Sequence, residues 1–143
     1  MTFSAGVASA SMALYKVETA AVHVADGGGL NSTGYNLSVA VGHATYRLVV
    51  TTPPATTATA GVAFTQQPVV VINDQYGNQA DNDNTTTVTA ARAVGTATLQ
   101  GTTTVTVTGG TATFANLSYN KAEAITVGSV SYTHLTLPTI YSV

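Results

Sequence analysis

Apolar and polar positions alternate along much of the chain, and the main exception is a continuous apolar run from Val69 to Ile72. Four β-branched residues in a row predict a strand that is buried on both faces. Asn73-Asp74 ends this run, and Gly77-Asn78 predicts a sharp reversal because glycine and asparagine tolerate positive φ. We therefore expect a central strand over 69–72, around which the other strands are ordered.

A hairpin is predicted where Gly109-Gly110 separates the alternating runs 102–108 and 111–117. A two-residue loop would place Val105 opposite Phe114 and Val107 opposite Ala112. The apolar pairs then share one face of the hairpin and the threonines share the other. We expect Val105 and Phe114 to point to the same side of one sheet.

Further strands are predicted by period-two alternation and by the abundance of threonine and valine. They cover residues 20–25, 34–41, 45–52, 85–91, 97–100 and 124–129. Several short antiparallel strands with frequent turns predict an all-β protein, with a β-sandwich of about seven strands. The predicted core consists of Leu48, Val50, Phe64, Val69, Val71, Val88, Leu99, Val105, Val107, Phe114 and Leu117.

Composition narrows the classes of function. The 143 residues suffice for about one domain, only 7% of them are charged, and the formal net charge is −2. This charge provides no electrostatic basis for binding nucleic acid or an anionic membrane. The sequence has no cysteine, which excludes disulfides and thiolate metal sites. No apolar run approaches the ~20 residues of a membrane-spanning helix.

The segment from Leu48 to Val127 resembles bacterial Ig-like repeats of large secreted and surface-anchored proteins, in the style of invasin and intimin stalks. The resemblance is carried by Leu48-Val49-Val50-Thr51-Thr52-Pro53-Pro54, Ala60-Gly61-x-x-Phe64, Val69-x-Val71-x-Asn73-Asp74-Gln75-Tyr76-Gly77-Asn78, Leu99-Gln100-Gly101-Thr102 and Gly110-Thr111-Ala112-Thr113-Phe114-x-Asn116-Leu117. It implies an immunoglobulin-like sandwich that occurs in tandem with other repeats outside the cell or on its surface. Its motifs are specific for the fold and loose for the function.

The resemblance also implies a division of the chain. Residues 45–129 form one whole repeat, and residues 1–44 look like the closing strands of a preceding, truncated repeat. Without their partner strands, residues 1–44 are expected to be poorly ordered or packed unnaturally. Residues 130–143 resemble a translated sequencing adapter, so we predict that this tail is not native and exclude it from the site analysis.

Acidic residues are concentrated in one place, the polar turn and loop that follow the central strand. Asp74, Asp81 and Asp83 could supply hard oxygen ligands to Ca²⁺, together with Asn73 and Asn78. Their spacing does not match an EF-hand loop. The alternative is turn chemistry, in which Asn and Asp side chains accept hydrogen bonds from their own backbone.

No constellation predicts catalysis. His23 and His43 are isolated in the sequence from a second ligand or an activating carboxylate. The chain has no G-x-S-x-G motif, and the glycines at 27–29 are not followed by the Lys-Ser/Thr pair of a phosphate-binding loop. We therefore expect no catalytic residue, no cofactor other than the Ca²⁺ considered above, and no enzymatic activity.

Two classes of function remain. The first is a structural spacer of an adhesion-related bacterial surface protein, whose partners are neighbouring Ig-like repeats and host or cell-surface molecules. The alternative is a glycan- or protein-binding accessory module of a secreted enzyme. Glycan binding usually requires exposed aromatic side chains, and Tyr76 and Tyr119 are the candidates within the repeat.

Overall fold

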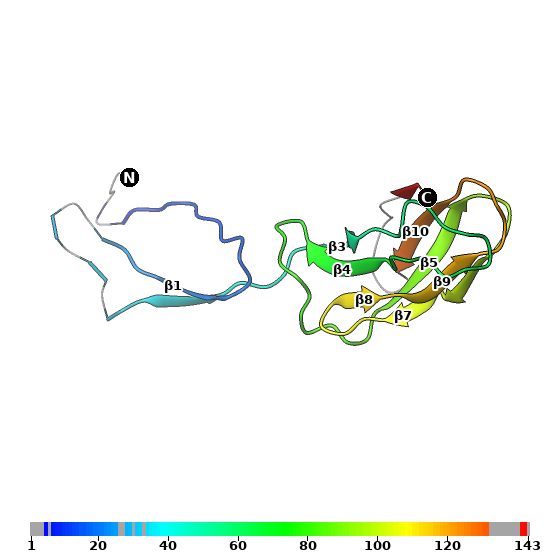
Figure 1. Cartoon of the computed structure of the whole chain (residues 1–143). Coiled ribbons are helices and arrows are strands. Elements are labelled where there is room, and N and C mark those ends of the chain that lie inside the picture. The colour runs from blue at the N-terminus through cyan, green and yellow to red at the C-terminus, as the bar shows by residue number, and fades with distance from the viewer. Residues whose placement is uncertain are drawn as a thin grey trace. The chain divides into compact units, whose positions relative to one another are not determined.

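The computed structural model describes residues 5, 7–25, 28–29, 31–32, 34–131 and 141–142. The chain divides into two compact units (Figure 1), Met1–Gly42 (unit 1) and His43–Val143 (unit 2), close to the boundary predicted after residue 44. The described residues form strands and no helix, which confirms the predicted all-β class. Accordingly, this part of the chain contains no helix that is long and apolar enough to cross a membrane.

Unit 1 contains one antiparallel hairpin, in which β1 (Thr19–Val22) pairs with β2 (Leu37–Ala40). Large apolar side chains on or beside β2 are exposed: Tyr35 is 87% exposed, Leu37 69% and Val39 40%. An isolated two-stranded hairpin is only marginally stable in water because it has no second layer to cover its apolar face. The described residues of unit 1 supply no such layer.

Unit 2 is a β-sandwich built from three sheets (Figure 1). One sheet has the strand order β3-β4-β8, the second has β11-β10-β5-β7, and β6 pairs with β9. The strands are β3 (Tyr46–Thr52), β4 (Val69–Asp74), β5 (Thr87–Val94), β6 (Leu99–Thr102), β7 (Thr104–Thr106), β8 (Thr111–Thr113), β9 (Ala115–Tyr119), β10 (Thr126–Ser131) and β11 (Tyr141–Ser142).

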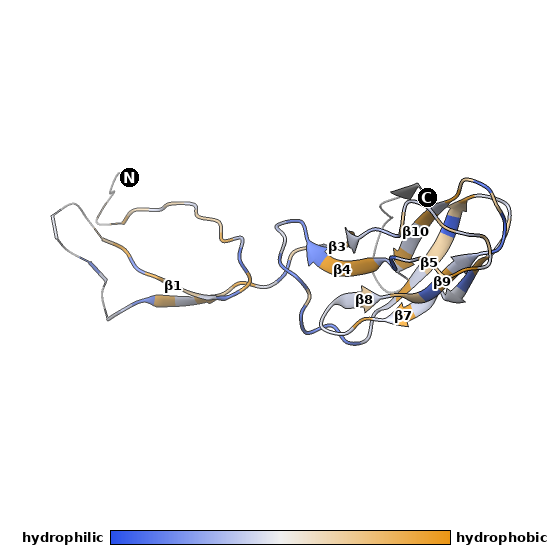
Figure 2. Cartoon of the chain, in the orientation of Figure 1, coloured by the Kyte–Doolittle hydropathy of each residue, from blue (hydrophilic) through white to orange (hydrophobic). Residues whose placement is uncertain are grey.

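The central position of β4 is confirmed. β3 pairs with one edge of β4 and β8 with the other. Val70, Val71 and Ile72 are all buried, as a strand covered on both faces requires. Figure 2 shows apolar residues along most of β4 and a hydrophilic tip, which corresponds to its last residues, Asn73 and Asp74.

The predicted inner face of β4 is wrong by one residue. Val70 and Ile72 belong to the main hydrophobic cluster, whereas Val69 is half-buried and the buried Val71 lies outside that cluster. A run of four apolar residues carries no polar alternation that could identify the inner face. Val50 and Val105 are also only half-buried, although they pack against the cluster. The remaining predicted core residues are buried: Leu48, Phe64, Val88, Leu99, Val107, Phe114 and Leu117.

The predicted hairpin at Gly109-Gly110 is correct at its turn and wrong in its strands. Thr108 and Thr111 form a bridge, and the two glycines have φ of 54° and 69°. Beyond the bridge the strands separate, because β7 pairs with β5 and β8 pairs with β4. Val105 and Phe114 therefore lie in or beside different sheets, and both pack against the core between them. The turn joins the two layers of the sandwich.

Unit 2 has more strands than the predicted seven, because the predicted run 111–117 divides at Phe114 into β8 and β9 and because β11 adds a strand in the tail. The pairing is also irregular. A register shift between Gln100 and Thr102 interrupts the pairing of β6 with β9. At this bulge Gly101 has φ of 94° and Asn116 has φ of 58°. A Cβ atom at position 101 would lie 2.0 Å from the carbonyl oxygen of Asn116. The two backbones approach so closely that only glycine fits at position 101.

The tail predicted to be non-native, residues 130–143, lies mostly outside the described residues. Val130 and Ser131 continue β10 past the predicted strand end at residue 129. Tyr141–Ser142 forms β11, which pairs antiparallel with Thr126 and Val127.

Replacing Phe114 with Ala should destabilise unit 2 by ~3–5 kcal/mol. Phe114 is only 2% exposed, so removal of its ring leaves a cavity in the core. Chemical denaturation measures the change. Tyr76→Ala is the matched control, since Tyr76 is 51% exposed. Equal unfolding free energies for the two variants would contradict the assigned core.

Gly110→Ala should destabilise unit 2 more than Gly77→Ala. Both positions have positive φ, but a Cβ atom at position 110 would lie 2.5 Å from the carbonyl oxygen of Ala80. A Cβ atom at position 77 would have no heavy atom of the described residues within 4 Å beyond its chain neighbours. The clash should add ~1–3 kcal/mol to the cost shared by both substitutions. Denaturation midpoints of the two variants provide the comparison, and similar midpoints would show that the turn can shift.

Candidate functional site

The acidic turn after β4 is organised by one buried carboxylate, that of Asp74. Oδ1 accepts hydrogen bonds from the backbone N–H groups of Tyr76 and Asn78, both at 2.9 Å. Oδ2 accepts from Asn78 Nδ2 at 2.8 Å and from Ala44 N at 3.2 Å. Burial raises the pKa of Asp74, but hydrogen bonds from Asn78, Ala44 and Tyr76 outweigh it and lower the pKa to about 2.

Asp83 organises the next turn in the same way. Its Oδ1 accepts from the N–H groups of Thr85 and Thr86, both at 3.0 Å, and its Oδ2 accepts from Thr86 Oγ1 at 2.6 Å. Burial raises the pKa of Asp83, but the hydrogen bonds from Thr86 and Thr85 together lower it by more. The net shift of the pKa is therefore downward. Asp81 lies between these turns and is exposed.

The three candidate calcium ligands are not assembled into a metal site. Asp74 and Asp83 each direct both carboxylate oxygens to donors of their own turns. Among the described residues, no group of three or more His, Asp or Glu side chains could hold a metal ion. The arrangement is that of turn chemistry, the alternative to calcium binding.

The histidines occupy separate places. His23 is exposed in unit 1. His43 lies in the strap, our term for residues 43–44, which precede β3. Its Nε2 is 3.0 Å from the carbonyl oxygen of Gln79, and its ring lies 5.2 Å from that of Tyr46. Because a carbonyl only accepts, Nε2 carries the proton. His43 thus joins Asp74 in fastening the strap to the turn after β4.

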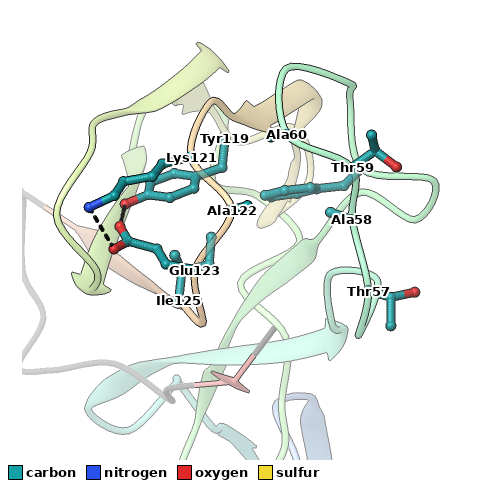
Figure 3. Close-up of a pocket in the computed structure, with 10 residues that line it drawn as sticks. Thr57, Ala58, Thr59, Ala60, Tyr119, Lys121, Ala122, Glu123 and Ile125 are labelled. Carbon is teal, nitrogen blue, oxygen red and sulfur yellow. Dashed lines mark hydrogen bonds and ion pairs between the residues drawn. The ribbon is translucent and has the colours of Figure 1, made fainter.

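A cavity of about 330 Å³ lies at the other end of the strands (Figure 3). Its walls come from the segment before Phe64 and from the loop between β9 and β10. The lining residues are Thr57, Ala58, Thr59, Ala60, Phe64, Tyr119, Lys121, Ala122, Glu123 and Ile125. Most of them present methyl or ring carbons, and the polar groups gather on the side formed by Tyr119, Lys121 and Glu123.

These polar groups bind one another. The Tyr119 hydroxyl donates to Glu123 Oε1 at 2.5 Å and accepts from the N–H groups of Thr96 and Ala97 at 3.0 and 2.6 Å. Glu123 Oε1 also accepts from Thr96 N at 2.6 Å, and Lys121 Nζ lies 3.2 Å from Glu123 Oε2. Hydrogen bonds, first from Tyr119 and then from Thr96, lower the pKa of Glu123 to about 2.

The Tyr119–Glu123 network was not predicted, and its sequence signal is slight. Tyr119 and Glu123 are four residues apart, and Gly95 leaves room for the hydroxyl: a Cβ there would lie 2.8 Å from it. The carboxylate, the phenol and the ammonium satisfy one another, so the network fastens the loops at this end of the sandwich. The Tyr119 hydroxyl lies beside the Glu123 carboxylate, but it already takes part in three hydrogen bonds and Tyr119 is only 4% exposed.

The two candidate aromatics for glycan binding do not share a surface. Tyr119 is only 4% exposed, and its ring stands at the wall of the cavity (Figure 3). Tyr76 is 51% exposed and follows Asp74 at the opposite end of unit 2. Stacking on a sugar ring requires an accessible aromatic face, which Tyr76 alone of the two provides.

The carboxylates of Asp74 and Glu123 predict that unit 2 loses stability in acid. Their pKa values of about 2 lie below the ~3.9 and ~4.3 of unfolded Asp and Glu. Protons therefore bind the unfolded chain first. The stabilisation is complete above about pH 5 and is lost progressively as the pH falls toward about 2. Thermal unfolding over this range should show Tm falling with pH.

Asp74→Asn and Glu123→Gln should each lower Tm near neutral pH and flatten its decline in acid. Asp81→Asn is the control, because the Asp81 side chain is exposed, and it should keep the parent profile. A parent Tm that stays constant down to about pH 2 would contradict the assigned protonation.

Comparison of the chain with protein-family models, with curated proteins and with solved structures finds no match. A functional assignment therefore depends on the geometry of the described residues and on their chemistry. That geometry consists of two hydrogen-bonded carboxylate networks, one at each end of a β-sandwich.

Proposed function

We propose that unit 2 is a structural spacer, a bacterial Ig-like module of an extracellular or cell-surface protein with a role in adhesion. The observation that carries this proposal is the fastening of the strap to the turn after β4. Ala44 N donates to Asp74 Oδ2, and His43 Nε2 donates to the carbonyl oxygen of Gln79. These bonds hold the chain at the point where it enters β3, which is where a load from a preceding segment would reach unit 2.

The distribution of polar groups also supports a spacer. Asp74, Asp83, Glu123 and Lys121 engage in hydrogen bonds or an ion pair within unit 2. Side chains that are already paired must lose those partners before they can bind a ligand, which lowers the affinity they can provide. A module whose charged groups fasten its own loops is suited to transmit force between its neighbours, which in a tandem protein are further repeats.

An accessory glycan-binding module is the second candidate. The cavity beside Phe64 and Tyr119 favours it, since concave apolar surfaces with a few polar groups are typical of ligand sites. Against it, the cavity polar groups are engaged with one another, and the more exposed aromatic, Tyr76, lies at the other end of unit 2.

Single-molecule pulling tests the spacer proposal. The chain has no cysteine, so Gly42→Cys, just before unit 2, and Ala122→Cys, in the loop between β9 and β10, provide unique handles that place β3 to β9 under load. Unit 2 should unfold in one cooperative event. Asp74→Asn should lower the force at which the strap detaches, because an amide nitrogen cannot accept the hydrogen bond from Ala44. Asp81→Asn should leave the force unchanged, and equal forces for all three chains would contradict the proposal.

An array of glycans and surface proteins, probed with the full chain, tests the second candidate. The spacer proposal expects no saturable glycan binding. Binding that disappears in Tyr76→Ala, or in Lys121→Ala at the cavity, would instead assign the protein to the accessory modules.

A further inference from the structure

The two ends of unit 2 carry side-chain charge of opposite sign. Asp74, Asp81 and Asp83 lie near the strap, and Arg47 at the start of β3 is the one Lys or Arg beside them among the described residues. Burial, and then the charges of these three carboxylates, raise the pKa of Tyr46, which places all three around the start of β3. The strap end is therefore net negative.

The cavity end is net positive. Lys121 lines the cavity, and its side chain is 53% exposed. Arg92 lies near the end of β5 and donates to the carbonyl oxygen of Gly95. Glu123 is the one carboxylate at this end among the described residues. An ammonium carries three protons, and the described contacts of Lys121 engage two of them, with Thr96 and Glu123.

The cavity itself has a buried apolar floor and an exposed mouth (Figure 3). Phe64, Tyr119 and Ile125 form the floor and are 3–5% exposed. Residues 57–60 and 121–122 form the mouth and are exposed. A cavity of roughly 150 Å³ is large enough for benzene, so the 330 Å³ here can hold an aromatic side chain. Because the polar groups of its wall bond to one another, an apolar ring matches this cavity better than a sugar does.

Tyr76, at the strap end, is an exposed aromatic residue on a well-defined turn. Its backbone N–H donates to Asp74 Oδ1 at 2.9 Å. Two more bonds close the turn around it, from Gly77 N to Asp74 O at 3.1 Å and from Asp74 N to Asn78 O at 2.9 Å. Tyr76 is 51% exposed, and its neighbours Gln75 and Gly77 are exposed as well. An aromatic side chain on a backbone that is already ordered makes a good anchor, because less conformational entropy is lost on binding.

We propose that Tyr76 of one copy of unit 2 inserts into the cavity of a second copy, so that copies associate head to tail through ends of opposite charge. In this arrangement the strap end, with its exposed Asp81, meets the end that carries Lys121. Charge complementarity of this kind orients the partners and fixes their register more than it adds affinity. Because the contact joins two different surfaces of the same unit, each added copy presents a further site.

A second copy is the occupant because unit 2 supplies both halves of the contact but cannot join them itself. Tyr76 follows the last residue of β4, whereas the cavity contains Phe64, which precedes the first. The six residues of β4 separate the two by about 20 Å. The ring and the cavity of one unit therefore face away from each other along the strands.

This docking deepens the spacer proposal and depends on it for its setting, in which consecutive repeats would meet through these two surfaces. One ring in one cavity buries little area, so the contact between separate chains should be weak. Tethering raises the effective concentration of neighbouring modules to the millimolar range. At that concentration a weak contact is sufficient to hold neighbouring modules in line.

Sedimentation velocity of the full chain, at concentrations up to about 1 mM, tests the docking. The average mass of the parent should rise with concentration, and added salt should weaken the rise by screening the charged ends. Tyr76→Ser should stay monomeric because the ring is gone, and Ala58→Phe because its side chain fills the cavity from the mouth. Both positions are exposed, so neither substitution disturbs the core. Tyr35→Ser, which removes a more exposed ring from unit 1, is the control and should associate like the parent.

An equimolar mixture of the two monomeric variants provides the second measurement. Tyr76→Ser retains the cavity and Ala58→Phe retains the ring, so the mixture should form dimers and no larger species. A parent that stays monomeric, association that survives either substitution, association that Tyr35→Ser abolishes, or a mixture that stays monomeric would each overturn the docking. The pulling experiment measures unit 2 within one chain and does not depend on these outcomes, so the spacer and docking proposals can fail separately.

Discussion

The structure depends on the way a buried charge is accommodated at the end of β4. A carboxylate away from water requires donors for its oxygens, and Asp74 obtains them from Tyr76, Asn78 and Ala44. The first two fix the reversal after the central strand. The third brings in the strap and so determines where β3 begins. One side chain therefore couples the first strand of unit 2, the central strand and the turn that leads to β5.

The far end of unit 2 applies the same principle to longer loops. Glu123 accepts from Tyr119 and Thr96, and the Tyr119 hydroxyl accepts from Thr96 and Ala97. The segments before β6 and after β9 are thereby joined at a point where strand pairing has ended. Between these two polar ends, the apolar side chains of the main sheets and of β6 and β9 form one cluster.

The sequence allowed the class of fold to be predicted because period-two alternation and β-branched composition report on strands directly. The sequence could not specify which strands pair with one another. The Gly109-Gly110 turn was predicted, but the assignment of β7 and β8 to different sheets depends on competition for the edges of β4 and β5, which are distant in sequence. The sequence could not identify which residues of β4 face the core, because both faces of the strand are apolar. Asp74 was selected for its charge, whereas Glu123 was missed because its partner Thr96 lies in a loop that is remote in the sequence.

The bulge shared by β6 and β9 has a consequence for how this domain can diverge over generations. Gly101 and the backbone of Asn116 occupy nearly the same space, so a side chain can appear at position 101 only after position 116 has moved. Asn116 in turn holds a left-handed conformation that few residue types tolerate. Lineages that descend from this chain are constrained to change the two positions together or to keep both.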